Sequence, residues 1–272
     1  MSIELMMVAL LRLIQEGCYY DRVGVDGTSI RDLNMWALDA FFQQYEVDFS
    51  AETEADKIRL LTNTDLLSEA GTVTVAGLLI FGINPARHLP PCGITFARLA
   101  GTEIDGELID RQNLNGTLDH QVNTGQALIG NHIRTPSEIR GMKRVDTRAI
   151  PPPKVIRELL VNACVHRNYA IVGSKIRIFL FDDRMSIISP GRLPNTVTVE
   201  KLKAGVSYAV NPVIVKFMEN LRFIDRLGRG LPMVWREMEK LGGGVEVKEI
   251  GEELNVTIWW EGEDGRWKGT NP

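Results

Sequence analysis

Residues 155–169 read Val-Ile-Arg-Glu-Leu-Leu-Val-Asn-Ala-Cys-Val-His-Arg-Asn-Tyr, and this is the most informative stretch of the sequence. Glu158 and Asn162 are four residues apart, so a helix places them on one face, about 40° apart around its axis. Tyr169 falls on the same stripe, and the adjoining face is apolar. A carboxylate can accept a proton from water, and an amide oxygen can hold a hard cation such as Mg²⁺. The spacing therefore predicts a base and a metal ligand on one helix, although a solvated helix edge has the same pattern.

The wider context of this helix resembles a known group of proteins. The Glu-x-x-x-Asn helix is similar to the N-box of the Bergerat-fold ATPases. The longer string 157–163, followed by His166-Arg167-Asn168-Tyr169, resembles a narrower family of prokaryotic predicted transcriptional regulators. Those proteins carry a Schlafen AlbA-type (divergent AAA) N-terminal domain and a Bergerat or GHKL-like ATPase C-terminal domain, and some are described as RecG-like, ATP-dependent DNA helicase relatives. The resemblance implies that Glu158 is the catalytic base and that Asn162 contacts nucleotide and holds Mg²⁺.

A second segment resembles the part of the Bergerat site that reads the base. Ser189-Pro190-Gly191 lies where those ATPases carry Asp-x-Gly, in which the Asp reads the adenine amino group and the glycine lets the backbone approach the base. Gly191 is kept, but Ser189 replaces the Asp. A hydroxyl can accept a hydrogen bond, but more weakly than a carboxylate and without charge assistance. The resemblance implies that both residues contact nucleotide, whereas Ser-Pro-Gly taken alone indicates only a turn.

A glycine pair precedes a predicted helix near the C-terminus. Gly228 and Gly230 lie in the string 226–234, which resembles the second glycine box of the same ATPases, with Pro232 at one glycine position. A helix N-terminus offers backbone N–H groups and a favourable dipole to phosphate. We therefore expect both glycines to cradle nucleotide phosphates, although glycines here could also simply end one helix and begin the next.

Composition excludes several classes of protein. The 272 residues carry a net charge of −4 with a pI of about 5.7, so no global basic field for nucleic acid exists. The cysteines at positions 18, 92 and 164 fit no zinc spacing and no disulfide framework, which indicates a reducing cytoplasm. The apolar segment 3–14 contains charges and is too short to span a bilayer, so we expect a buried helix. The chain contains no P-loop motif, which argues against a helicase motor.

The order of predicted elements indicates an α+β fold with a small mixed α/β N-terminal portion. Residues 1–50 resemble a remnant of the AlbA-type domain, so we expect either a truncated chain or a reduced family member. Residues 51–150 predict a middle α/β region, with helices within 52–67, 74–82 and 118–133 and strands near 94–99 and 105–111. Pro151-Pro152-Pro153 marks the next boundary, because proline suits a first helical turn.

The remaining residues, 151–262, are expected to form a Bergerat-like α/β sandwich. After the Glu158 helix the pattern predicts a strand hairpin at 175–188, helices within 198–220 and 231–241, and two final strands at 245–250 and 254–260. That order of elements is hard to obtain by chance. Residues 263–272 are polar and are expected to form a flexible tail.

One concentration of basic residues lies in the middle region. Arg140, Lys143, Arg144 and Arg148 fall within 134–157, where basic residues outnumber acidic ones. They could contact nucleic-acid phosphates, neutralise nucleotide phosphates, or be solvated linker charges. We expect DNA binding by this chain alone to be weak.

Two functions from different classes follow from the sequence. The first is an ATP-binding, transcription-related regulator that uses Mg²⁺ and hydrolyses ATP slowly or not at all. The second is a non-catalytic scaffold, in which a degenerate ATPase fold serves dimerisation or DNA-associated regulation. Both imply a cytoplasmic homo-oligomer with no membrane segment, and nucleotide binding distinguishes them.

Overall fold

The computed structural model describes residues 19–133, 137–140, 143–146, 150–194, 197–206, 208–224 and 228–260. For 137–140 and 143–146 only the backbone is described. The helix expected at 3–14 and the tail expected at 263–272 lie outside the described residues.

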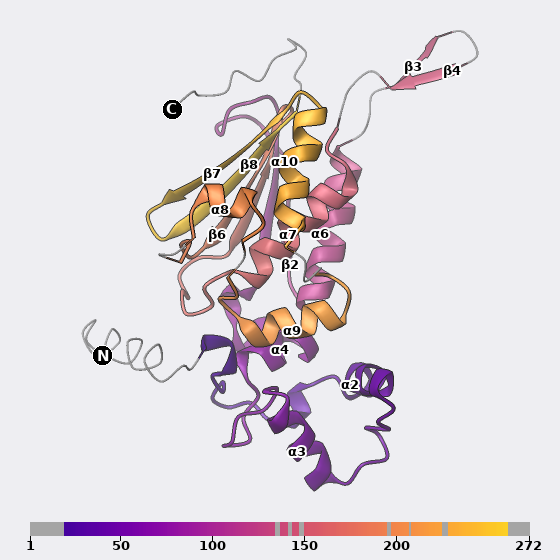
Figure 1. The fold of residues 1–272 in the computed structure, drawn as a ribbon, viewed down its shortest axis with the longest axis vertical. Coiled ribbons are helices and arrows are strands. Elements are labelled where there is room, and N and C mark those ends of the chain that lie inside the picture. Colours follow the sequence, from indigo (N-terminus) through magenta and orange to yellow (C-terminus); the bar gives the residue numbers. More distant parts are fainter. Residues whose placement is uncertain are drawn as a thin grey trace.

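A 6-stranded mixed sheet forms the centre of the molecule, in the order β2-β1-β5-β6-β8-β7 (Figure 1). Its strands are β1 (Ile94–Leu99), β2 (Leu108–Leu114), β5 (Ile176–Leu180), β6 (Arg184–Pro190), β7 (Gly244–Ile250) and β8 (Glu253–Trp259). β1 and β5 pair in parallel, and the other neighbours pair antiparallel. These strands match the predicted ones to within a few residues, and the predicted α+β fold class is confirmed.

The sheet joins segments from both sides of residue 150. β1 and β2 come from the middle region, whereas β5 to β8 come from the expected sandwich, and Ile94 pairs directly with Ile176. Buried apolar residues from both regions also form one continuous core. The boundary expected at 150/151 therefore separates two segments of chain that share one sheet and one core.

Three helices cover one face of this sheet (Figure 1). They are α6 (Leu118–His132), α7 (Pro153–Val165) and α10 (Gly230–Lys240). α7 begins at Pro153, as the proline triplet predicts, and ends at Val165. Tyr169 therefore does not lie on the stripe of Glu158 and Asn162; its ring is buried beyond the helix, and its hydroxyl donates to the Cys164 carbonyl at 2.8 Å.

Most of the shorter helices lie below the sheet in the view of Figure 1, and α8 (Val199–Lys203) packs against α10. The first group, from residues 19 to 92, comprises η1 (Tyr20–Arg22), η2 (Ile30–Asp32), α2 (Met35–Phe42), η3 (Gln43–Tyr45), α3 (Glu54–Asn63), α4 (Val75–Phe81), α5 (Pro85–His88) and η4 (Pro90–Cys92). Two more, α8 and α9 (Pro212–Asn220), follow β6. α4 is buried along its whole length, which confirms the predicted core helix. Within the described residues, every helix is too short or too polar to cross a bilayer.

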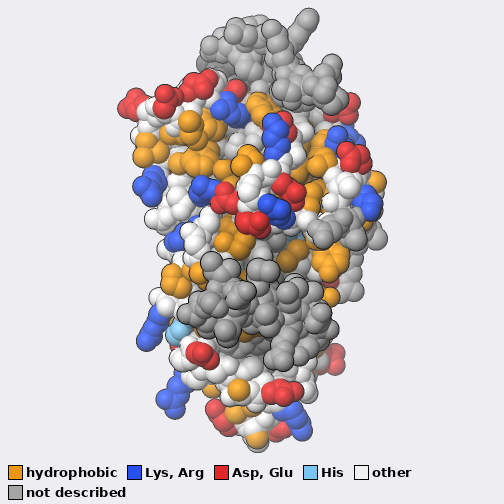
Figure 2. Space-filling view, turned by 90° about the vertical axis from the view of Figure 1, so that its left-hand side faces the viewer, with side chains coloured by type: hydrophobic (Ala, Val, Ile, Leu, Met, Phe, Trp, Pro, Cys, Tyr) orange, Lys and Arg blue, Asp and Glu red, His pale blue; other side chains and the backbone are white. Residues whose placement is uncertain are grey.

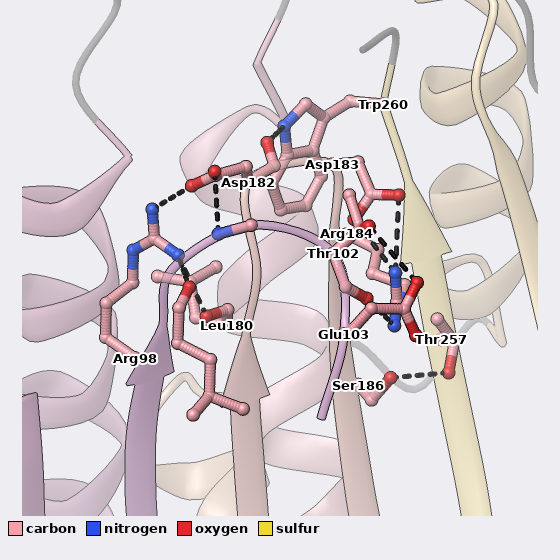
Figure 3. A network of polar contacts seen from close by, with 12 residues as sticks. Arg98, Thr102, Glu103, Leu180, Asp182, Asp183, Arg184, Ser186, Thr257 and Trp260 are labelled. Atoms are coloured by element: carbon pink, nitrogen blue, oxygen red, sulfur yellow. Dashed lines mark hydrogen bonds and ion pairs between the residues drawn. The ribbon is translucent and has the colours of Figure 1, made fainter. Parts of the chain in front are cut away.

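Polar contacts fasten the loop after β1 to the turn between β5 and β6 (Figure 3). Asp182 pairs with Arg98 and accepts a hydrogen bond from the Gly101 amide at 2.9 Å. The Trp260 indole donates to the Asp182 carbonyl at 3.1 Å. These contacts join the end of β1 and the loop after it, the turn between β5 and β6, and the residue that follows β8. They therefore connect three strands at the end of the sheet remote from α9.

A separate 2-stranded ribbon projects from the body of the molecule (Figure 1). It consists of β3 (Ser137–Arg140) and β4 (Lys143–Asp146), paired antiparallel with Arg140 opposite Lys143. The sequence did not predict this ribbon, because each strand has only four residues and no apolar alternation.

Candidate functional site

Helix α7 brings Glu158 and Asn162 together as predicted. Both side chains are half-buried. The Asn162 amide nitrogen donates to the Glu158 carboxylate at 2.6 Å and to the Glu158 carbonyl at 2.7 Å. An amide that donates through its nitrogen keeps its oxygen as an acceptor or metal ligand. The contact therefore orients the carboxamide and leaves the pair chemically suited to one base and one cation ligand.

The Glu158 carboxylate lies against the first residue of α10. A β carbon built on Gly230 would lie 1.9 Å from Oε1 of Glu158, so any other residue at this position would displace the carboxylate. Gly230 opens α10, whose N-terminus carries the positive end of the helix dipole. Residues 158 and 230, far apart in the sequence, thus form one corner, in which a carboxylate faces a helix N-terminus.

Gly228 meets a second glycine that the sequence analysis missed. Both Gly228 (φ 63°) and Gly205 (φ 85°) adopt left-handed backbone conformations. A β carbon on Gly228 would lie 2.4 Å from the Gly205 carbonyl oxygen, and one on Gly205 would lie 2.8 Å from that of Gly228. The two loops therefore touch backbone to backbone beside the corner.

A helix-end signal could have identified Gly205. The Gly205 amide donates to the Leu202 carbonyl at 3.0 Å, and the Val206 amide donates to the Lys201 carbonyl at 2.9 Å. These two bonds form the Schellman motif that ends α8, for which glycine is the usual residue.

Two adjoining cavities lie here, one among α7, α8, α9 and α10 and the other between α7, α10 and the sheet. The first, polar, cavity is lined among others by Glu158, Asn162, Glu219, Gly228 and Gly230. The second, mainly apolar, cavity is lined among others by Leu159, Ser189, Gly191, Trp235 and Val256. Asn162 and His166 line both cavities. Every predicted nucleotide-contacting residue therefore lines at least one of these two adjoining cavities, which are together called the hollow.

The hydroxyl proton of Ser189 is engaged in a hydrogen bond within the protein. Its buried hydroxyl donates to the Ala163 carbonyl of α7 at 3.0 Å. A hydroxyl keeps two acceptor lone pairs when its proton is engaged. Ser189, which lines the apolar cavity, therefore keeps acceptor capacity after its proton is engaged.

Gly191 allows the turn after β6 to approach the end of α7. It has φ 125°, and a β carbon there would lie 3.1 Å from the Asn168 Cβ. The Asn168 amide also donates to the Pro190 carbonyl at 2.8 Å. The glycine is thus needed for packing between two backbone segments, whatever it contacts in the cavity.

His166 is a further residue of the hollow, to which the sequence assigned no role. It follows the last residue of α7. Burial lowers the pKa of His166 to about 4, opposed by a hydrogen bond to the backbone of Tyr208. The imidazole is therefore neutral at pH 7 and joins α7 to the loop before α9.

The adjacent Arg167 has a structural role. Its side chain is fully buried. The guanidinium donates to the carbonyls of Asn168, Ile171 and Ser174 at 3.2, 2.8 and 2.8 Å, and it lies 4.7 Å from the Tyr169 ring centroid. The His-Arg-Asn-Tyr string thus fixes the chain leaving α7, which in turn fixes the orientation of the helix.

The basic residues of the middle region are placed only by their backbone. Arg140, Lys143 and Arg144 belong to the β3–β4 ribbon, and nothing is described of their side chains. Arg148 lies outside the described residues. Figure 2 shows one face of the body, on which acidic and basic side chains are interspersed. That face therefore shows no extended field of one sign.

Comparison with known proteins assigns part of the chain. Residues 173–258 match the family model described as "Putative ATP-dependent DNA helicase recG C-terminal". This segment is therefore similar to an ATPase-type domain of the RecG C-terminal kind. It includes Ser189, Gly191 and the glycine pair, while Glu158 and Asn162 precede it.

A solved structure extends the similarity in fold beyond the ATPase-type domain. The DIP2311 protein from Corynebacterium diphtheriae superposes with a TM-score of 0.63 and 20% sequence identity, over 91% of this chain and 48% of that one. The chain thus spans about half the length of that relative, and the likeness shows the fold alone. A search of curated proteins found no match.

Proposed function

We propose that the hollow between α7, α10 and the sheet binds an adenine nucleotide with Mg²⁺. The observation that carries the proposal is the corner where the Glu158–Asn162 pair meets Gly230 at the N-terminus of α10. A carboxylate, a carboxamide and a helix N-terminus at one end of a partly apolar cavity suit a ligand with an aromatic base and phosphates.

The apolar cavity supports binding of the base. Its walls offer aliphatic side chains from α7, α10 and the sheet, and Ser189 offers a hydrogen-bond acceptor. An exocyclic amino group is a donor, so adenine matches this acceptor, whereas the oxygen that guanine carries there would face a lone pair. The site should therefore prefer adenine.

The polar cavity supports binding of the phosphates. Gly228 and Gly230 let the start of α10 approach Gly205 and Glu158 closely, and α10 presents its positive end at the cavity that these residues line. Mg²⁺ would neutralise phosphate charge when bound, and the Asn162 amide oxygen is the side-chain ligand that fits it. No group of three or more His, Cys, Asp or Glu that could hold a metal gathers among the described residues, so phosphate and water would complete its shell.

Glu158 is positioned to act as a base in slow hydrolysis. Its carboxylate is held by Asn162 at the N-terminus of α10. A carboxylate in that place can orient a water molecule and accept its proton. The resemblance to transcriptional regulators extends the proposal to a regulatory role for nucleotide in transcription.

The test is a melting measurement with ATP and Mg²⁺. Ligand at about 100 times its dissociation constant should stabilise the fold by roughly 2.7 kcal/mol. GTP at the same concentration should give a smaller shift, and ATP with excess chelator should separate nucleotide from cation effects. A folded sample with no shift at millimolar ATP and Mg²⁺ would contradict the proposal.

One observation favours a second candidate, a non-catalytic scaffold. The charged adenine acceptor is replaced by Ser189, whose hydroxyl already joins β6 to α7. In this alternative the fold serves dimerisation or DNA-associated regulation without nucleotide. The same melting measurement decides between the two candidates, because only the first requires a shift.

A further inference from the structure

Helix α9 forms a wall of the polar cavity and also packs against the N-terminal region. Val215 and Glu219 line the cavity that contains Glu158. Phe217, on another side of α9, is buried, and its ring centroid lies 5.1 Å from that of Phe41 and 5.6 Å from that of Phe81. α9 is therefore in contact with α2 and α4 and with the candidate site at the same time.

Asp21 caps α9 from the other end of the sequence. This fully buried residue of η1 accepts hydrogen bonds through Oδ2 from the Val213 amide at 2.7 Å and the Ile214 amide at 3.1 Å. The partners are 192 and 193 residues apart in the chain. A carboxylate at this place satisfies two of the N–H groups that a helix start leaves unpaired, and its charge favours the helix dipole.

The residue at the usual capping position has a different task. Asn211 precedes α9 but makes no side-chain capping bond within the described part of the chain. Its buried amide instead donates to the carbonyls of Val165 and Arg167, both at 2.8 Å. These carbonyls belong to the end of α7 and the residues just after it. One rigid connection thus runs from Asp21 through the start of α9 to the helix that carries Glu158 and Asn162.

We propose that Asp21 is a positioning residue for the nucleotide site, acting through α9. On this proposal, attachment of residues 19–23 and occupation of the polar cavity stabilise each other. If attachment favours ligand binding, ligand must favour attachment by the same factor, because such coupling is reciprocal. The ligand part of this inference rests on the proposed function, whereas the mechanical connection does not.

Three variants test the proposal. Asp21→Ala removes the cap, and Asp21→Asn keeps an acceptor oxygen in its place. Asn34→Ala is the matched control, because Asn34 caps α2 by accepting from the Ala37 amide at 3.1 Å and has no described hydrogen bond to α9. Two quantities are measured: hydrogen exchange without nucleotide at residues 158–165 and 212–220, and the affinity for ADP with Mg²⁺.

Asp21→Ala should speed exchange in both segments and weaken ADP binding by about tenfold, within the usual range for coupled sites. Asp21→Asn should restore most of the affinity, and Asn34→Ala should leave it unchanged. Faster exchange at 212–220 with unchanged exchange at 158–165 and unchanged affinity would overturn the proposal.

Two further outcomes, an unfolded Asp21→Ala variant and a wild-type protein that does not bind ADP, also decide the proposal. If Asp21→Ala does not fold, Phe217→Leu loosens α9 from its other side, and the same two measurements carry the same expectations and the same overturning result. If the wild-type protein does not bind ADP, the proposed function fails. The mechanical connection is then decided by whether Asp21→Ala or Phe217→Leu speeds exchange at 158–165.

Discussion

The Glu158 carboxylate lies so close to the α carbon of Gly230 that a β carbon there would approach Oε1 to 1.9 Å. This relationship joins the α7 pair to the start of α10. It also means that the carboxylate occupies the end of α10 where an anionic ligand would be favoured. The chemistry of the site therefore depends on a glycine that contributes no side chain.

Gly230→Ala should displace the Glu158 carboxylate and abolish nucleotide binding or turnover, with a much smaller effect on folding. The overlapping atoms belong to the end of a side chain that can move, so the fold can accommodate the methyl group while the corner cannot. The measurements are ADP affinity and unfolding in denaturant. Gly173→Ala is the control, because a β carbon there meets nothing within 4 Å. Equal losses of affinity in the two variants would contradict the assignment of Gly230.

Glu158→Ala and Asn162→Ala should have separable effects. If ATP is hydrolysed, loss of the base should reduce turnover by about 10²–10⁴-fold while largely sparing binding. Asn162→Ala should instead weaken the binding that depends on Mg²⁺. Steady-state turnover and binding titrations with and without Mg²⁺ measure both. Wild-type turnover by Glu158→Ala would show that another group is the base.

Ser189→Ala should destabilise the fold and reduce discrimination between bases. Its hydroxyl bonds the Ala163 carbonyl in a buried setting, and leaving that acceptor unpaired costs about 1–3 kcal/mol. Loss of the acceptor lone pairs should bring the affinities for ADP and GDP closer together. Ser186→Ala is the control, since Ser186 bonds Thr257 on the same strand pair but does not line the cavities. An unchanged ratio of ADP to GDP affinity in Ser189→Ala would contradict base reading by Ser189.

Asp21 should make stability fall as pH rises from about 4 to 6. Burial raises the pKa of Asp21 from 3.8 to about 6, against two backbone hydrogen bonds that lower it. The folded protein therefore retains a proton that the unfolded chain releases, and the stabilisation present below pH 4 is lost above pH 6. The change amounts to about 3 kcal/mol.

Other carboxyl groups, such as Asp110 and Glu237, have pKa values that are lowered and act in the opposite direction. The useful quantity is thus the free energy of unfolding of wild type minus that of Asp21→Asn, measured by urea unfolding between pH 4 and 7. A difference that is constant with pH would show that Asp21 titrates normally.

DNA binding, if present, should be weak and steeply dependent on salt. Arg140 and Lys143 lie opposite each other at the end of the projecting ribbon, and Arg144 follows on β4. A two-stranded ribbon can enter a major groove, but phosphate contacts position a protein without specifying sequence. Each neutralised phosphate contributes about −0.9 to the log–log salt slope.

Changing Arg140, Lys143, Arg144 and Arg148 together to Ser should reduce that slope toward zero. The measurement is a titration of mixed-sequence duplex DNA at two salt concentrations. Tight binding to one sequence at physiological salt, or a variant indistinguishable from wild type, would contradict the prediction.

Local sequence patterns were enough to predict most helices and strands and the Glu158–Asn162 pair on α7. These predictions rest on short-range signals, namely the proline triplet 151–153, the helical spacing of Glu158 and Asn162, and the alternation along the strands. The same signals misplaced Tyr169, because a local stripe cannot show that α7 ends at Val165. They also missed the β3–β4 ribbon, whose strands are too short for a pattern.

The way these pieces combine depends on contacts that exist only in the folded chain. The approach of Gly230 to Glu158, the contact of Gly205 with Gly228, and the capping of α9 by Asp21 join residues that are far apart in the chain. Such contacts form because burying the shared core brings distant backbones together, and the constraints on each position then come from its neighbour in space. In the sequence, Asp21 beside Arg22 has the pattern of an ordinary turn residue. Its role follows from the two amides of α9 that the fold places against it.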